Sequence, residues 1–204
     1  MREQAPRDGK GTSDDPARRR IETAMLELSG EVGYRSVTLE ALLSRSEATA
    51  EEFSANFASL PACFAAAYEA EAEDLCIAVL MAAKRKKDWW AGTEAGLNTV
   101  LQFAADRPLI ARALVREVHV AGGAALVKHE EVLDRLARAM GEDCKDPSTE
   151  MSIPRAPIFI VGAVEGVIAG SLDRGETQHL PSTARELMEL IASFFIGGEA
   201  QQGQ

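Results

Sequence analysis

The stretch TLEALLSRSEATAEEFSANF, residues 38–57, determines the architecture of the N-terminal part of the chain. Thr38 can cap a helix, and residues 46–49 interrupt it. The inward face of this helix is expected at Leu39, Leu42 and Leu43. The residues from Thr49 to Glu52 fit a capping box that opens another short helix. The apolar side of that helix carries Phe53 and Phe57. The pattern predicts two short helices joined by a tight turn.

A longer helix is predicted before this pair. Asp15 can act as its N-cap with Pro16 at the first helical position, and Gly33 can close it. Its apolar residues recur at helical spacing: Ile21, Ala24, Met25, Leu28 and Val32. Residues 1–15 are charged and without periodicity, so we expect a disordered tail. Three helices in this order are typical of a helix-turn-helix unit that binds DNA, but the periodicity alone also allows a plain three-helix bundle.

The remainder of the chain is also predicted to be helical. A long helix begins at Ser59 and ends near the basic run KRKK, residues 84–87, where cations suit the negative end of the helix dipole. Further helices, separated by Gly, Pro and polar breakers, are expected at 89–105, 108–120, 126–140, 158–172 and 182–196. No segment shows the alternation of a strand. The predicted fold class is all-α, with an N-terminal three-helix helix-turn-helix domain and a larger helical domain.

The charge balance argues against a protein that coats nucleic acid or an anionic membrane. The 204 residues include 22 Lys and Arg against 32 Asp and Glu, a formal net charge of −10. The longest apolar run, Ile158 to Leu172, is short for a membrane span and contains Glu165. Three cysteines without metal-ligand spacing are expected as reduced thiols: Cys63, Cys76 and Cys144. These features predict a soluble cytoplasmic protein with no membrane partner.

Residues between Arg20 and Tyr68 resemble the DNA-binding region of the TetR family of bacterial transcription regulators. The matching positions fall in register together: Arg20, Ile21, Ala24, Leu28, Gly33, Tyr34, Val37, Thr38, Leu42, Leu43, Ala48, Thr49, Phe53, Phe57 and 63–68. The total length and the all-helical remainder are also similar to that family. The resemblance implies a helix-turn-helix domain at residues 16–62 and a helical effector-binding and dimerisation domain at residues 63–204.

The departures from the family pattern lie on the side that would face DNA. Glu47 stands where family members usually have a glycine in the turn, and Leu60 replaces a phosphate-binding lysine. Glu51, Glu52 and Ser54 stand where the reading helix usually carries a small Gly-Thr pair and a tyrosine. The scaffold therefore resembles the family more closely than the reading surface does.

Acidic residues dominate the expected reading surface. From residue 36 to residue 60 the chain carries one basic residue, Arg45, and four glutamates, a net charge of −3. A glutamate on the reading helix either accepts a hydrogen bond from cytosine or belongs to a solvated helix end. Flanking arginines either contact phosphates or form a solvated charge run. The candidate DNA-binding residues are Arg18, Arg19, Arg20, Arg35, Thr38, Thr49, Glu51, Glu52, Ser54 and Asn56. We expect weak, salt-sensitive binding to operator DNA, or none.

The larger domain is expected to bind a small effector, as the resemblance implies. The segment 89–105 is apolar on more than one face, which is typical of a helix in the middle of a domain. The candidate ligand-binding residues are Trp89, Trp90, Phe103, Glu117, His119 and Glu165. Each also has a purely structural interpretation, as core packing, a local contact or an ion pair across a dimer. Few charges converge, so we expect a largely apolar effector of unknown identity.

The last two predicted helices are candidates for a homodimer interface. Gly162, Gly166 and Gly170 recur every four residues and leave a smooth ridge on which another helix can pack closely. The final helix carries a wide apolar stripe: Leu187, Leu190, Ile191, Phe194 and Phe195. Packing within one chain would explain both features, whereas the resemblance implies a two-fold four-helix interface.

The sequence contains no motif typical of an enzyme. The pair His129-Glu130 lacks the second histidine of a zinc helix, and no glycine loop that could cradle a phosphate follows a strand. We therefore predict no catalytic residue, no metal and no cofactor. Two hypotheses remain: a TetR-like regulator, expected to be a repressor that an effector releases from its operator, or a dimeric ligand-binding or interaction module of the same fold that does not read DNA.

Overall fold

The computed structural model describes residues 15–143 and 155–193, and every regular element in these ranges is a helix. The all-α prediction is confirmed. The predicted N-terminal tail lies outside the described residues apart from Asp15, and so does Cys144. The last residues of the predicted final helix, Phe194, Phe195 and Ile196, lie outside them as well.

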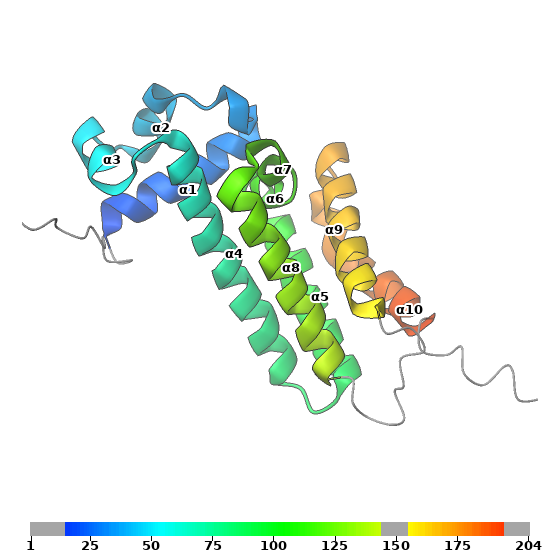
Figure 1. The fold of residues 1–204 in the computed structure, drawn as a ribbon. Helices are drawn as coiled ribbons and strands as arrows, with labels where there is room; N and C mark the ends of the chain where they lie inside the picture. The colour runs from blue at the N-terminus through cyan, green and yellow to red at the C-terminus, as the bar shows by residue number, and fades with distance from the viewer. Residues whose placement is uncertain (1–14, 144–154, 194–204) are drawn as a thin grey trace, which may run out of the picture.

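The N-terminal unit contains the three predicted helices and one additional short turn (Figure 1). Its elements are α1 (Pro16–Val32), the 3-10 turn η1 (Tyr34–Ser36), α2 (Leu39–Ser46) and α3 (Ala50–Asn56). The predicted helix ends are confirmed. Asp15 caps α1 and Gly33, with φ 85°, ends it. Thr38 caps α2, and Thr49 and Glu52 form the capping box of α3.

One position on the predicted inward face of α2 is wrong. Leu42 is fully buried and Leu43 is half-buried, but Leu39 is 39% exposed. Leu39 is the first residue of an eight-residue helix that packs mainly against α1. The contact with α1 therefore covers the middle of α2 and leaves its first residue in solvent.

The rest of the described chain forms a helical bundle. Its elements are α4 (Leu60–Lys84), α5 (Trp89–Asp106), α6 (Pro108–Arg112), the π-helical segment η2 (Ala113–Glu117), α7 (Val118–Ala121), α8 (Gly123–Asp143), α9 (Ala156–Arg174), the 3-10 segment η4 (Thr177–Thr183) and α10 (Ala184–Ser193). The predicted helix at 108–120 is thus present as α6, η2 and α7 in succession.

Three helices begin at other positions than predicted. α8 starts at Gly123 because Gly122 and Gly123, both with positive φ, reverse the chain and let the next helix begin at once. α9 starts at Ala156, since Pro157 fits the first turn of a helix, where its missing N–H has no partner to lose. Residues 182 and 183 belong to η4, so the last helix begins at Ala184.

Helix α4 packs against both α5 and α8, with the N-terminal unit across one end of this bundle and α9 and α10 along one side (Figure 1). One apolar core joins the N-terminal unit to the bundle, because Met25 of α1 and Phe64 of α4 belong to the same buried cluster as Ile110 and Val118. The expected domain boundary at residue 62 therefore falls in the first turn of α4. Any movement of α4 acts on both parts.

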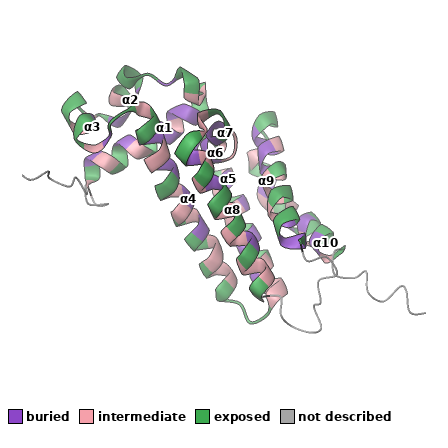
Figure 2. Cartoon of the chain, viewed as in Figure 1, coloured by how far each residue is buried: buried purple, intermediate pink, exposed green. Residues whose placement is uncertain are grey.

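One face of α9 has no cover within the described chain. Its exposed residues lie on one side of the helix: Ile158, Phe159, Gly162, Ala163 and Gly166 (Figure 2). By length and composition α9 is the one helix among the described residues that could cross a membrane, with a mean hydropathy of 1.5. Glu165, however, lies in the middle of α9, and the opposite side of the helix packs against α8. The exposed side is therefore an apolar surface that none of the described residues covers.

Candidate functional site

The first candidate site is the surface formed by α2, the turn and α3. The Thr38 hydroxyl accepts a hydrogen bond from the backbone N–H of Ala41 at 3.2 Å. The Thr49 hydroxyl accepts one from the N–H of Glu52 at 3.1 Å, and the Glu52 carboxylate accepts one in return from the N–H of Thr49 at 2.7 Å. Three of the predicted DNA-binding residues thus hold the helix ends in place.

The remaining predicted residues of α3 differ in what they present to solvent. Glu51 and Ser54 are exposed, and the Ser54 hydroxyl donates to the Glu51 carbonyl at 3.1 Å. The Asn56 amide is half-buried and donates to Asp15 at 3.3 Å and to the Glu52 carbonyl at 3.0 Å. Asn56 therefore ties α3 to the start of α1, while Glu51 and Ser54 form the outward surface.

Several basic side chains near the motif are paired within the chain. Arg18 lies 2.8 Å from Glu22 and stacks over the Phe57 ring at 5.0 Å. Burial is the largest influence on Glu22 and raises the pKa of this carboxyl despite Arg18. Arg20 donates to the Ser46 carbonyl at 3.2 Å. These arginines are therefore partly engaged in holding α1, α2 and α3 together.

The other basic residues of the unit lie at its edges. Arg19 is exposed near the start of α1, and Arg35 is exposed on η1 beyond its end. Arg45, the single basic residue between positions 36 and 60, lies 2.6 Å from Glu31 and 3.8 Å from Glu27. The outward surface of α3 consequently keeps a negative charge at Glu51.

The second candidate site is a cavity of about 210 Å³ between α4, α5, α8 and α9. Its lining runs along α4 from Tyr68 to Lys84, a span of roughly 24 Å at 1.5 Å per residue. The walls are almost entirely apolar, with Leu75, Val79, Leu97, Val100, Leu133 and Ile168 among them. A cavity of this form suits a slender apolar molecule.

Two of the six predicted ligand-binding residues line this cavity, namely Trp89 and Glu165. The Trp89 indole donates to the Met140 carbonyl at 2.9 Å and so joins the ends of α5 and α8. Trp90 packs edge-on against Trp89, with the ring centroids 4.8 Å apart, and does not line the cavity. Phe103 is half-buried among the core residues at the other end of α5.

Glu117 and His119 also lie outside the cavity lining. Glu117 is buried in η2, and its carboxylate accepts a hydrogen bond from the backbone N–H of Tyr34 at 2.8 Å. This contact links the bundle directly to the turn after α1. Short π-helical segments such as η2 are frequent at functional sites. Glu117 therefore ties η2 to the N-terminal unit instead of lining the cavity.

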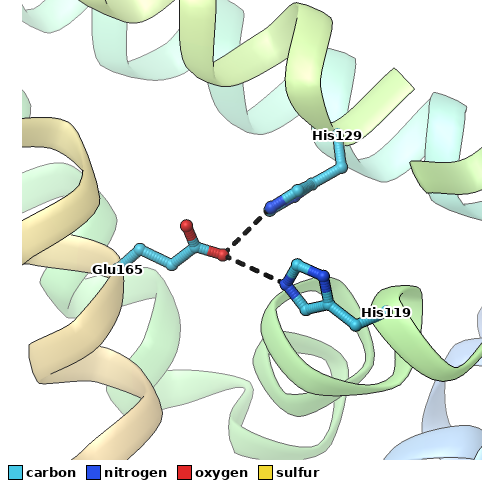
Figure 3. A group of neighbouring side chains, drawn as sticks. All are labelled: His119, His129 and Glu165. Atoms are coloured by element: carbon cyan, nitrogen blue, oxygen red, sulfur yellow. Dashed lines mark ion pairs between the residues drawn. The ribbon is translucent and has the colours of Figure 1, made fainter. Parts of the chain in front are cut away.

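One end of the cavity is polar. The Tyr68 hydroxyl lies 2.8 Å from His129 Nδ1, and His129 Nε2 lies 3.1 Å from a Glu165 oxygen. His119 Nε2 lies 4.0 Å from the same oxygen (Figure 3). Burial, and then the nearby Glu165 charge, raise the pKa of the Tyr68 phenol. These four residues come from α4, α7, α8 and α9.

His129 is not among the ligand-binding residues predicted from the sequence. It is 5% exposed and sits on the inward side of α8, four residues after buried Ala125 and three before half-buried Val132. That spacing is the signal that could have identified an inward histidine. Its partners, Tyr68 and Glu165, are too distant in sequence for any local pattern to reveal.

No family model and no curated protein matches the chain in sequence. Solved structures, in contrast, match it over most of its length. The fatty acid degradation regulator FadR from Bacillus halodurans aligns with a TM-score of 0.80 at 14% identity, covering 93% of this chain and 99% of that one. FadR from Bacillus subtilis, solved with stearoyl-CoA, aligns with a TM-score of 0.76 at 13% identity, covering 85% and 97%.

A TetR-family regulator from Marinobacter aquaeolei VT8 aligns with a TM-score of 0.67 at 14% identity, covering 85% of this chain and 96% of that one. At these identities the likeness concerns the fold. It extends through both the N-terminal unit and the helical bundle, since almost the whole of each chain is covered. The chain therefore has the all-helical fold of the TetR-family transcriptional regulators.

Proposed function

We propose that this protein is a TetR-like DNA-binding transcription regulator that responds to a small, mostly apolar effector. The observation that carries the proposal is the position of α4. It starts in the core of the helix-turn-helix unit and continues as a wall of the apolar cavity. In this proposal residues 16–62 contact DNA, and residues 63–204 bind the effector and form the dimer in the cytoplasm.

The effector would act by favouring one of two arrangements of α4 and η2. A ligand shifts such an equilibrium only if it binds the two arrangements with different affinities. Filling the cavity presses on α4, while the bond between Glu117 and the Tyr34 N–H carries a displacement of η2 to the N-terminal unit. The regulator is then a repressor that leaves its operator when the cavity is filled.

The cavity supports an effector with an extended hydrocarbon chain. Its length along α4 and its apolar walls suit an acyl chain, and a solved structure with the same fold holds stearoyl-CoA. Lys84 at the end of the cavity opposite Glu165 offers a positive charge for an anionic head group. We therefore propose a long-chain acyl thioester or a fatty acid as the effector class.

The open face of α9 supports a homodimer through the last two helices. A β-carbon placed on Gly162 or Gly166 would meet no other atom of the described residues within 4 Å, so this surface can receive a second helix at close range. Ile158 and Phe159 extend the same face. A two-fold dimer would present two helix-turn-helix units to the half-sites of a palindromic operator.

DNA contact in this dimer would come from the edges of each unit. We assign phosphate contacts to Arg18, Arg19, Arg20 and Arg35. Thr38 and Thr49, at the starts of α2 and α3, would lie beside the DNA backbone. Glu51 and Ser54 would contact bases, while Glu52 and Asn56 hold α3 in position. Glu51 would accept a hydrogen bond from cytosine N4.

A second function is favoured by the charge of this surface. Glu51 is exposed, and Arg45 is occupied by Glu31 and Glu27, so little positive charge remains on the reading side. A dimeric ligand-binding or interaction module of the same fold that does not bind DNA would have such a surface.

A fluorescence anisotropy titration separates the two functions. The full-length dimer is titrated with the duplex upstream of its own gene and with a scrambled duplex, at low and moderate salt. A regulator binds its own duplex more tightly, and stearoyl-CoA, but not CoA alone, releases it. The Glu51→Gln/Glu52→Gln variant, which keeps an acceptor for the capping box, should bind more tightly because repulsion from phosphates is removed.

Absence of binding at low salt by both the wild type and the double variant would reject the regulator and favour the interaction module. Binding that stearoyl-CoA leaves unchanged would keep the regulator and reject the proposed effector class. The matched control is Glu94→Gln on α5, which removes an exposed charge outside the helix-turn-helix unit.

A further inference from the structure

The side chains of His119, His129 and Glu165, here called the His–Glu cluster, converge from α7, α8 and α9 (Figure 3). We propose that the His–Glu cluster is a binding site for a divalent transition-metal ion, with Zn²⁺ as the best fit. The proposal is independent of DNA binding, because it rests only on the geometry of these side chains.

The distances in the His–Glu cluster are close to those of a metal site. One ligand atom from each residue lies within 4.8 Å of the other two. Ligands about 2.0–2.1 Å from a tetrahedral Zn²⁺ are separated from one another by about 3.4 Å. The pair of His129 Nε2 and Glu165 Oε1 is at 3.1 Å, and His119 Nε2 is at 4.0 Å from that oxygen. A small rotation of His119, whose side chain is 54% exposed, brings the set to coordination distance.

The Glu165 oxygen at the centre of the His–Glu cluster makes no hydrogen bond within the described residues, although it is buried. Buried carboxylate oxygens are normally paired, and an unpaired one is costly. Two imidazole nitrogens lie 3.1 Å and 4.0 Å from this oxygen as ion-pair contacts, and neither donates a hydrogen bond to it. A metal ion bound by the Glu165 oxygen and the two histidine Nε2 atoms would give the buried oxygen a partner. It would also be coordinated by the lone pairs of the two nitrogens.

His129 is also held in the orientation that a metal ligand needs. Its Nδ1 lies 2.8 Å from the Tyr68 hydroxyl, which fixes the ring and leaves Nε2 directed toward Glu165. A hydrogen bond on the second ring nitrogen is a regular feature of metal-bound histidines. Tyr68 is itself 2% exposed, so the orienting group is fixed by the core.

The ligand types select the ion. Two imidazoles and one carboxylate suit Zn²⁺ and its neighbours in the first transition row, whereas Mg²⁺ and Ca²⁺ prefer an all-oxygen set. Three protein ligands leave one coordination position open. Because His129 and Glu165 both line the cavity, an ion held by them would lie at the polar end of the cavity.

The test uses untagged full-length protein stripped with a chelator and dialysed. Zn²⁺ binding is measured by calorimetry, and Co²⁺ is added separately because tetrahedral Co²⁺ with nitrogen and oxygen ligands has intense visible d–d bands. We expect one Zn²⁺ per chain, a raised melting temperature, and a tetrahedral Co²⁺ spectrum. His119→Ala and Glu165→Gln should each weaken binding more than about 100-fold, and Tyr68→Phe about 10-fold.

His179→Ala is the matched control, because it removes an exposed histidine of η4 that is outside the His–Glu cluster. Circular dichroism verifies that each variant is folded, and His119→Ala changes an exposed side chain, so its loss of binding would not reflect unfolding. Zn²⁺ binding that is equally strong in His119→Ala and Glu165→Gln, or no Zn²⁺ binding by folded wild type, overturns the proposal. In the second case the polar end of the cavity holds only the hydrogen bond between Tyr68 and His129 and the ion-pair contact between His129 and Glu165.

Discussion

At the scale of single residues, Glu47 adopts a conformation that its side chain disfavours. It is the one non-glycine residue with positive φ among those described, with φ 51° and ψ 36° in the turn between α2 and α3. A left-handed conformation costs a residue with a β-carbon about 1–2 kcal/mol. The turn between the two helices is therefore kept at a cost in stability, and its geometry is imposed by the packing of Leu42 and Phe53 on either side.

Glu47→Gly should raise the free energy of unfolding by about 1 kcal/mol, because glycine adopts positive φ without steric conflict. Urea denaturation measures the change. Glu47→Ala is the control: it also removes the charge but retains a β-carbon, so it should be less stable than Glu47→Gly. Equal stability of the two variants would show that the charge, and not the backbone, determines the effect.

Cys63 illustrates how burial controls reactivity. It is fully buried, and burial together with the charge of Glu22 raises the pKa of its thiol to about 12. The thiolate is the reactive form, so the native protein at neutral pH should resist iodoacetamide at Cys63. Peptide mapping by mass spectrometry measures the labelling. The same peptide in urea serves as the control and should be labelled rapidly; equal rates in both states would contradict the burial argument.

At the scale of helices, the close contact of α1 with α6 positions the N-terminal unit on the bundle. A β-carbon on Gly30 would lie 2.0 Å from the carbonyl oxygen of Leu109. Backbone cannot yield as a flexible side chain can, so only glycine allows the two helices to approach this closely. Gly30 therefore determines the distance between the helix-turn-helix unit and the segment that leads to η2.

Gly30→Ala should lower the free energy of unfolding by about 1–3 kcal/mol, since α1 must move away from α6. Thermal and urea denaturation give the size of the loss. Gly141→Ala on α8 is a matched glycine-to-alanine change outside the proposed dimer face, where the new β-carbon would make an ordinary contact, 3.4 Å from Pro157 Cγ, so it should not destabilise the fold. If Gly30→Ala were as stable as the wild type, the close approach of α1 and α6 would be dispensable.

At the scale of the whole molecule, the exposed face of α9 predicts an association that a single substitution can prevent. Gly166→Arg places a long charged side chain on this face and should convert a dimer into a folded monomer, as measured by size-exclusion chromatography with light scattering. Asn98→Arg adds the same charge at an exposed position of α5 and should leave the dimer intact. A dimer that persists in Gly166→Arg would place the interface elsewhere.

Sequence reasoning succeeded where the determining interactions are local. The caps at Asp15, Thr38 and Thr49 bond to backbone groups two or three residues away, so their residue types alone indicate the helix starts. It failed for the polar end of the cavity, because His129 and Glu165 lie 36 positions apart on different helices and meet only through the packing of α8 on α9. Leu39 is exposed for a similar reason, because its burial depends on which helices pack against α2 and not on the local sequence.

The uncovered face of α9 also makes the stability of the protein depend on its concentration. If two chains associate through this face, association stabilises the folded state by mass action, and the melting temperature rises as the protein is concentrated. α9 carries Glu165 into the cavity, so dilution would loosen the same helix that lines the ligand site. The amount of protein in the cell would then determine both how many chains are paired and how many cavities are fully formed.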